Sequence, residues 1–159
     1  MMVYVFDQYS LQYMLEQFPR TIAPELWQSF QQHCQEGTIV SHREVQKSLD
    51  NLLVEQDSLE WLKANSSMFR PTTQLEANFL GEMMQSKELD FLNTPDLTIR
   101  RLPEAIPFLL SMAYTHGIYY VFRKNTQPEI FPKIKRLCNM HGIKRMEVED
   151  CLFKLKSDV

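Results

Sequence analysis

Apolar residues along the chain alternate between short continuous runs and longer stretches with helical spacing. Residues 3–6 (VYVF), 38–40 (TIV) and 118–122 (IYYVF) are rich in β-branched and aromatic side chains and predict buried strands. Alternating strands and helices predict an α/β fold of three layers, with helices on both faces of a mainly parallel sheet of four or five strands. We expect residues 3–6 and 118–122 to lie side by side at its centre, nearly free of solvent.

Apolar residues three or four positions apart predict helices between these strands. Ser41 is expected to cap one of them, because Glu44 follows three residues later as in a capping box. Residues 86–102 show no clear period. The predicted helices cover residues 11–18, 24–36, 45–53, 57–64, 73–85 and 104–116, followed by a last βα-like unit with helices at 130–141 and 146–155 and a short β-like piece at 142–143.

Composition limits the class of protein. The 159 residues have a net charge of −3 and predict a single domain over residues 1–159 with no global attraction to nucleic acid, so any RNA contact needs a local basic patch. Three cysteines without a CxxC pair predict neither a disulfide nor a zinc site. No targeting segment or long apolar run is found, which predicts a cytoplasmic protein without membrane contact.

Two acidic residues follow the first two predicted strands. Asp7 ends the first strand, and Glu44 lies one turn into the helix after the second. Functional groups of parallel α/β folds gather at the carboxyl ends of the strands, where two carboxylates repel each other unless a cation lies between them. The pair therefore indicates a site for Mg²⁺ or Mn²⁺ and predicts a raised pKa for at least one carboxyl. The alternatives are a capping-box role for Glu44 and a turn-forming role for Asp7.

The order of several segments resembles a known family. These segments are V-Y-V-F-D-Q-Y-S-L at the start, S-H-R-E-V after the second strand, A-I-P-F-L-L-S-M-A-Y-T-H-G in a later helix and I-Y-Y-V-F after it. Together they are similar to the PIN-like domain, in the bacterial branch long labelled as a domain of unknown function, over residues 3–155. The resemblance implies a PIN fold and kinship with VapC-like toxins of toxin–antitoxin pairs, which cut RNA with a divalent metal held by three or four acids. It also implies an antitoxin or other protein partner, RNA, or a second copy.

Only part of that acidic site has a counterpart in this sequence. Asp7 and Glu44 match the first two acids, whereas Ile106 stands at the third and Lys124 at the acid after the later strand. The resemblance thus implies an incomplete site with weak or absent Mg²⁺ binding and catalysis, in a protein that acts by binding a partner protein or RNA. An apolar side chain and a cation would remove most of the negative field that holds the metal, and Lys124 could take the metal's volume.

The alternative is an active Mg²⁺-dependent endoribonuclease toxin. It would use Asp7, Glu44 and a third acid, for which Glu104 is the first candidate and Asp90 and Asp96 are others. The four histidines lack metal-ligand spacing and are expected in capping or surface roles. Basic residues such as Arg43 and Arg123 are interpreted either as an RNA-backbone patch or as ordinary solvated charge.

Overall fold

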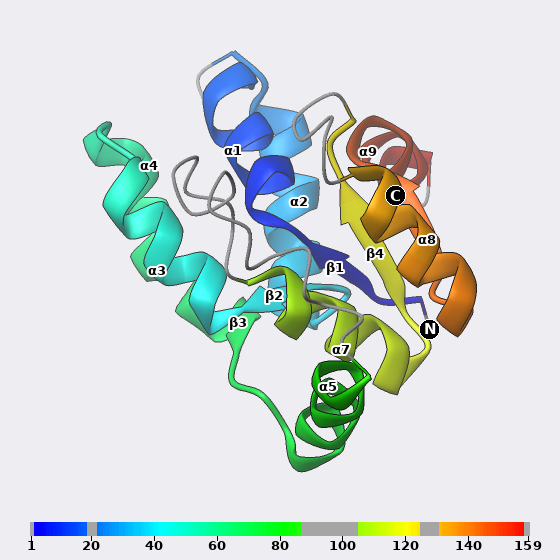
Figure 1. Cartoon of the computed structure of the whole chain (residues 1–159). Coiled ribbons are helices and arrows are strands. Elements are labelled where there is room, and N and C mark those ends of the chain that lie inside the picture. The colour runs from blue at the N-terminus through cyan, green and yellow to red at the C-terminus, as the bar shows by residue number, and fades with distance from the viewer. Residues whose placement is uncertain (1, 19–21, 87–104, 125–130, 158–159) are drawn as a thin grey trace.

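The computed structural model describes residues 2–18, 22–86, 105–124 and 131–157 (Figure 1). Its centre is a five-stranded sheet with the strand order β3-β2-β1-β4-β5, in which each neighbouring pair is parallel. This confirms the predicted α/β class and the parallel sheet. The strands are β1 (Tyr4–Phe6), β2 (Ile39–His42), β3 (Phe69–Arg70), β4 (Tyr119–Phe122) and β5 (Arg145–Glu147).

Helices cover both faces of the sheet (Figure 1). On one face, α2 packs on β2, and α9 packs on β4 and β5. On the other face, α7 crosses β1, β2 and β4. Helix α5 packs against the outer side of α7. A 3-10 turn at Ser66–Met68 precedes β3. The helices are α1 (Gln8–Gln17), α2 (Pro24–Glu36), α3 (Arg43–Leu52), α4 (Gln56–Ala64), α5 (Gln74–Gln85), α7 (Ile106–His116), α8 (Phe131–His141) and α9 (Val148–Ser157).

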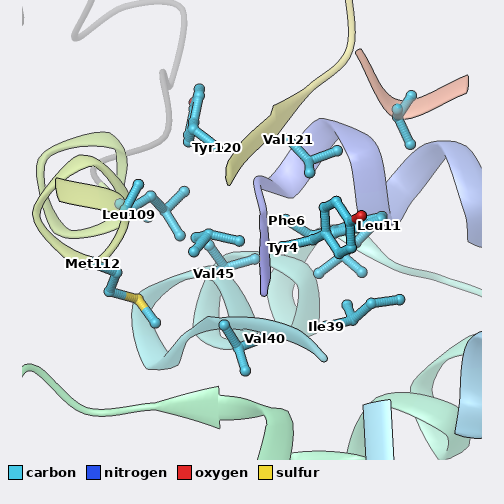
Figure 2. Close-up of a cluster of buried hydrophobic side chains, with 14 of the residues drawn as sticks. Tyr4, Phe6, Leu11, Ile39, Val40, Val45, Leu109, Met112, Tyr120 and Val121 are labelled. Carbon is cyan, nitrogen blue, oxygen red and sulfur yellow. The ribbon is translucent and has the colours of Figure 1, made fainter. Parts of the chain in front are cut away.

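The core lies on both sides of β1, because alternate side chains of a strand point to opposite faces. Figure 2 shows Leu109 and Met112 of α7 on one side of β1 and Phe6 and Leu11 on the other. Phe6 meets Phe30 of α2 edge to face, with ring centroids 5.6 Å apart. All three residues of β1 are buried, which confirms the predicted central strand.

The predicted neighbour of β1 is also correct, with one difference. Val5 pairs with Tyr120 and Phe6 with Val121, so β4 lies directly beside β1. The two inner residues of β4 are buried, but Tyr119 and Phe122 at its ends are only half-buried. The two ends of β4 are therefore more exposed to solvent than its apolar sequence predicts.

Local differences concern the ends and edges of elements. The second strand continues to His42, two residues beyond the predicted end, and β3 was not expected. In the last unit the strand is Arg145–Glu147 rather than residues 142–143, so α9 begins at Val148. Gly37 ends α2 as predicted, with a left-handed φ of 80° that a side chain would strain.

Candidate functional site

Asp7 stands where β1 ends and α1 begins, at the carboxyl edge of the sheet. Its backbone N–H donates to the carbonyl of Val121, which ties this turn to β4 (3.1 Å). Its carboxylate is the N-cap of α1 and accepts a hydrogen bond from the backbone N–H of Ser10 (2.8 Å). Asp7 therefore has the local structural role that a helix start requires.

The carboxyl of Asp7 is enclosed rather than open to solvent. Only 5% of the residue is exposed, and the pKa of Asp7 rises from 3.8 to about 6. Burial is the main cause, because it disfavours the charged form, while hydrogen bonds from Ser10 and from the Tyr120 side chain oppose the rise. Asp7 thus titrates about two pH units above an ordinary aspartate.

Tyr120 is a site residue that the sequence analysis missed. It pairs with Val5 across β1 and β4, and this register places its side chain on the same face as Asp7, two residues beyond Val5. The Tyr120 side chain is buried, and its hydroxyl acts as a donor that lowers the pKa of the Asp7 carboxyl. Only the register of two strands far apart in sequence reveals this contact.

Tyr120→Phe is expected to raise the pKa of Asp7 above about 6, because it removes a hydrogen bond that favours the carboxylate. Carboxyl titration by NMR measures this change. Tyr119→Phe is the matched control, since Tyr119 points to the opposite face and stacks on Tyr4. A pKa of Asp7 that is unchanged in Tyr120→Phe would contradict the role assigned to this hydroxyl.

The start of α3 differs from the predicted capping box. Ser41 is the third residue of β2, and its hydroxyl donates to the carbonyl of Phe6 (2.7 Å), so it is not available as a cap. His42 is the N-cap instead, and its Nδ1 accepts from the backbone N–H of Glu44 (3.0 Å). The Ser41 prediction was wrong because the strand runs two residues further than its apolar sequence suggests.

His42 is held from three directions. Its Nε2 is 2.8 Å from the Thr72 hydroxyl, and its ring stacks on Phe108 with centroids 4.6 Å apart. Burial lowers the pKa of His42, which keeps the ring neutral and leaves Nδ1 free to accept a hydrogen bond. This capping role agrees with the role expected of the histidines.

Glu44 has a different environment from Asp7. Its Oε1 lies 3.3 Å from Nζ of Lys47 one turn along α3, and 31% of its side chain is exposed. The groups that shift the pKa of Asp7 among the described residues are Ser10 and Tyr120, in addition to burial. The predicted rise in a carboxyl pKa is therefore found at Asp7, but its cause is burial rather than repulsion by Glu44.

The remaining positions of the implied acidic site differ in their environments. Ile106 is the first residue of α7 and is 1% exposed. Lys124 lies on an exposed turn after β4 and is not among the groups that act on Asp7. Glu104, Asp90 and Asp96, the candidates for a third acid, lie outside the described residues.

The described side chains do not fit a divalent metal. A carboxylate cage needs several converging anionic oxygens, whereas Asp7 is engaged by Ser10 and Tyr120 and Glu44 is engaged by Lys47. Within residues 2–18, 22–86, 105–124 and 131–157, no three His, Cys, Asp or Glu side chains are grouped closely enough to hold a metal ion.

Comparison with known protein families identifies the family of this chain. The family model for a domain of unknown function, DUF4411, matches residues 4–158. The chain belongs to this family. A search of curated proteins finds no match.

The fold of this DUF4411 protein is similar to a chain in the crystal structure of VapBC2 from Rickettsia felis bound to a DNA fragment from the promoter. The two chains are 12% identical with a TM-score of 0.51, and the match covers 92% of this chain and 98% of the other. The fold is therefore PIN-like, as the sequence predicts. None of the described helices has the length and apolar character needed to cross a membrane.

Proposed function

We propose that this DUF4411 protein is a VapC-like PIN domain that acts by binding a partner protein or RNA and has weak or no nuclease activity. The environment of Asp7 carries the proposal: hydroxyl and backbone groups surround the carboxyl, and burial raises its pKa to about 6. A metal ligand at neutral pH benefits from a stable charge and from further anionic oxygens beside it. Asp7 is mostly ionised at pH 7, but the groups that act on its carboxyl within the described residues are neutral and add no anionic oxygen.

The buried side chain of Ile106 supports the same proposal. The resemblance to PIN-like domains assigns the third acid to this position, which in this chain belongs to the hydrophobic core. Two-metal and one-metal phosphodiester hydrolysis both depend on negative ligands that hold the cation beside the scissile phosphate. Without the third acid, the remaining pair supplies a weak field for such a cation.

Purified protein is therefore expected to show no Mg²⁺- or Mn²⁺-dependent cleavage of RNA, and calorimetric titration with either ion is expected to give no saturable heat. Asp7→Asn should leave both results unchanged, because the proposal gives Asp7 no catalytic step. Gel-resolved cleavage of a mixed RNA pool, with and without EDTA, measures the activity.

Metal-dependent RNA cleavage by the purified protein would support a different function. EDTA-sensitive cleavage that is abolished by Asp7→Asn and by Glu104→Gln would establish the alternative function, an active Mg²⁺-dependent endoribonuclease that uses Asp7, Glu44 and Glu104. The matched control is Glu36→Gln, which changes an exposed acid at the end of α2. Loss of activity in that variant as well would indicate a general effect of charge rather than a site.

A further inference from the structure

Strand β5 is the outer strand of the described sheet on the side of the molecule where α8 and α9 lie (Figure 1). A hollow of about 600 Å³ follows this strand. Every residue of the continuous segment 143–147 lines it, together with Tyr119, Phe122 and Asp150. Because successive side chains of a strand point to opposite faces, these consecutive residues share only their backbone edge. The hollow therefore follows an edge at which another strand can pair.

The register of β4 and β5 shows which backbone groups of β5 point outward. The Tyr120 N–H donates to the Lys144 carbonyl (2.8 Å), so Lys144 directs its backbone groups toward β4. Met146, two residues later, does the same. The backbone N–H and C=O of Arg145 and the N–H of Glu147 point to the outer side instead, where the described residues supply no further strand.

Arg145 and Glu147 carry opposite charges on either side of Met146. Alternation along the strand places the two charged side chains on one face of the sheet and Met146 on the other. Arg145 Nη1 donates to Asn139 (2.7 Å), and Glu147 Oε2 accepts from the backbone N–H of Glu149 (2.9 Å). Both contacts are exposed, and each uses only part of the donors of the guanidinium or the acceptors of the carboxylate.

This order of charges is complementary to itself in one arrangement. In an antiparallel pair of β5 strands with a two-fold axis at Met146, Arg145 of each copy lies opposite Glu147 of the other. A parallel pair in register, or an antiparallel pair shifted by two residues, brings like charges together. A shift by one residue does not fit the backbone, because only alternate residues direct their groups outward. The charges therefore select one register.

We propose that two copies of this protein associate through β5, so that their sheets join edge to edge into one continuous sheet. The Glu147 N–H of each copy donates to the Arg145 carbonyl of the other, and the two side chains pair across the axis. A second copy supplies both charges in the required order by symmetry, which favours it over an unrelated strand. The inference goes beyond the proposed function, because neither Asp7 nor Ile106 lies on β5.

Analytical ultracentrifugation of the full chain, from low-micromolar to near-millimolar concentration, tests this proposal. The paired strands are short, so we expect a reversible monomer–dimer equilibrium that weakens with salt. Arg145→Glu places like charges opposite each other and should raise the dissociation constant at least about tenfold. Lys135→Glu is the matched control and should dimerise like the wild type, because it reverses the same charge at an exposed position of α8 that does not line the hollow.

A double variant tests whether the two positions face each other. A chain with both Arg145→Glu and Glu147→Arg keeps the net charge of the wild type and has unlike charges in both cross-strand pairs, so dimerisation should return. Glu147 accepts from the Glu149 N–H at the start of α9, and a thermal melt therefore checks that the double variant folds.

A wild-type chain that stays monomeric over the whole range would overturn the proposal. Dimers that Arg145→Glu leaves intact would place the contact elsewhere on the surface and would also overturn it. The same holds if a double variant with the Tm of the wild type stays monomeric. If the double variant does not fold, the comparison of Arg145→Glu with Lys135→Glu decides.

Discussion

Asp7→Asn is expected to stabilise the folded protein by about 2–3 kcal/mol at about pH 8, because each unit of pKa shift corresponds to about 1.4 kcal/mol. Burial raises the pKa of Asp7 from 3.8 to about 6, so the folded chain must hold a carboxylate in an environment that favours the neutral acid. Asparagine is a good N-cap and keeps an acceptor for the Ser10 N–H. The substitution removes the cost of ionisation and retains the cap.

The pH dependence has a defined sign. A folded-state pKa above the unfolded value means that the folded chain binds the proton more tightly. The contribution of Asp7 to stability is thus complete below about pH 3.8, decreases as the pH rises through about 6, and is absent above it. The stability difference between Asp7→Asn and the wild type should therefore appear between these two pH values and grow with pH.

Urea unfolding over this pH range measures the difference, and Glu44→Gln is the control. Glu44 is partly exposed and paired with Lys47, so its neutralisation should change stability by no more than about 0.5 kcal/mol. A less stable Asp7→Asn at alkaline pH would show that the hydrogen bonds from Ser10 and Tyr120 to the carboxylate outweigh its burial. The stabilising result would show that the fold does not require an acid here.

The central strands were predictable because a strand that is buried on both faces has a continuous apolar sequence. The central strands are continuous runs of β-branched and aromatic residues, and a strand covered on both faces needs such a run. The edge strands are not continuous apolar runs. Arg145–Glu147 is half-buried and polar at two of three positions, and Phe69–Arg70 has only two residues, so neither has a periodicity that can be recognised.

The candidate site was predictable only where the backbone alone positions a residue. Asp7 follows a buried strand, so its place at the sheet edge follows from local sequence. Its contact with Tyr120 depends on the register between β1 and β4, which no local pattern specifies. The cap of α3 was misplaced for a related reason: Ser41 is a preferred cap by residue type, but the carbonyl of Phe6 on the neighbouring strand takes its hydroxyl.

Ile106→Asp is expected to destabilise the protein by about 3–5 kcal/mol, because it removes a buried aliphatic side chain and places a carboxylate in the core. Ile106 is 1% exposed in the first turn of α7. An acid near a helix N-terminus gains only about 0.3–1 kcal/mol from the helix dipole, which does not offset this loss. Thermal melts should show the loss as a decrease in Tm of roughly 10 °C or more.

The effect of Mn²⁺ on the Tm of Ile106→Asp shows whether the new carboxylate binds the ion or only destabilises the core. If position 106 faces Asp7, as the resemblance to PIN-like domains implies, millimolar Mn²⁺ should raise the Tm of Ile106→Asp, because an ion that binds only the folded state stabilises it. The matched variant Ile106→Asn has nearly the same size without the charge and should show no such increase. Ile106→Val, which keeps the site apolar, should lose only about 0.5–1.5 kcal/mol.

Lys124→Asp extends the test at little structural cost, because Lys124 is exposed and surface substitutions usually change stability by less than about 0.5 kcal/mol. Combined with Ile106→Asp, it changes the local charge by about −3 and should strengthen the Mn²⁺ effect if both positions face the cation. An equal Mn²⁺ effect in the wild type and in Ile106→Asn would instead place metal binding elsewhere. No Mn²⁺ effect in any variant would show that position 106 does not face Asp7, and that the interpretation of Ile106 as a lost ligand is wrong.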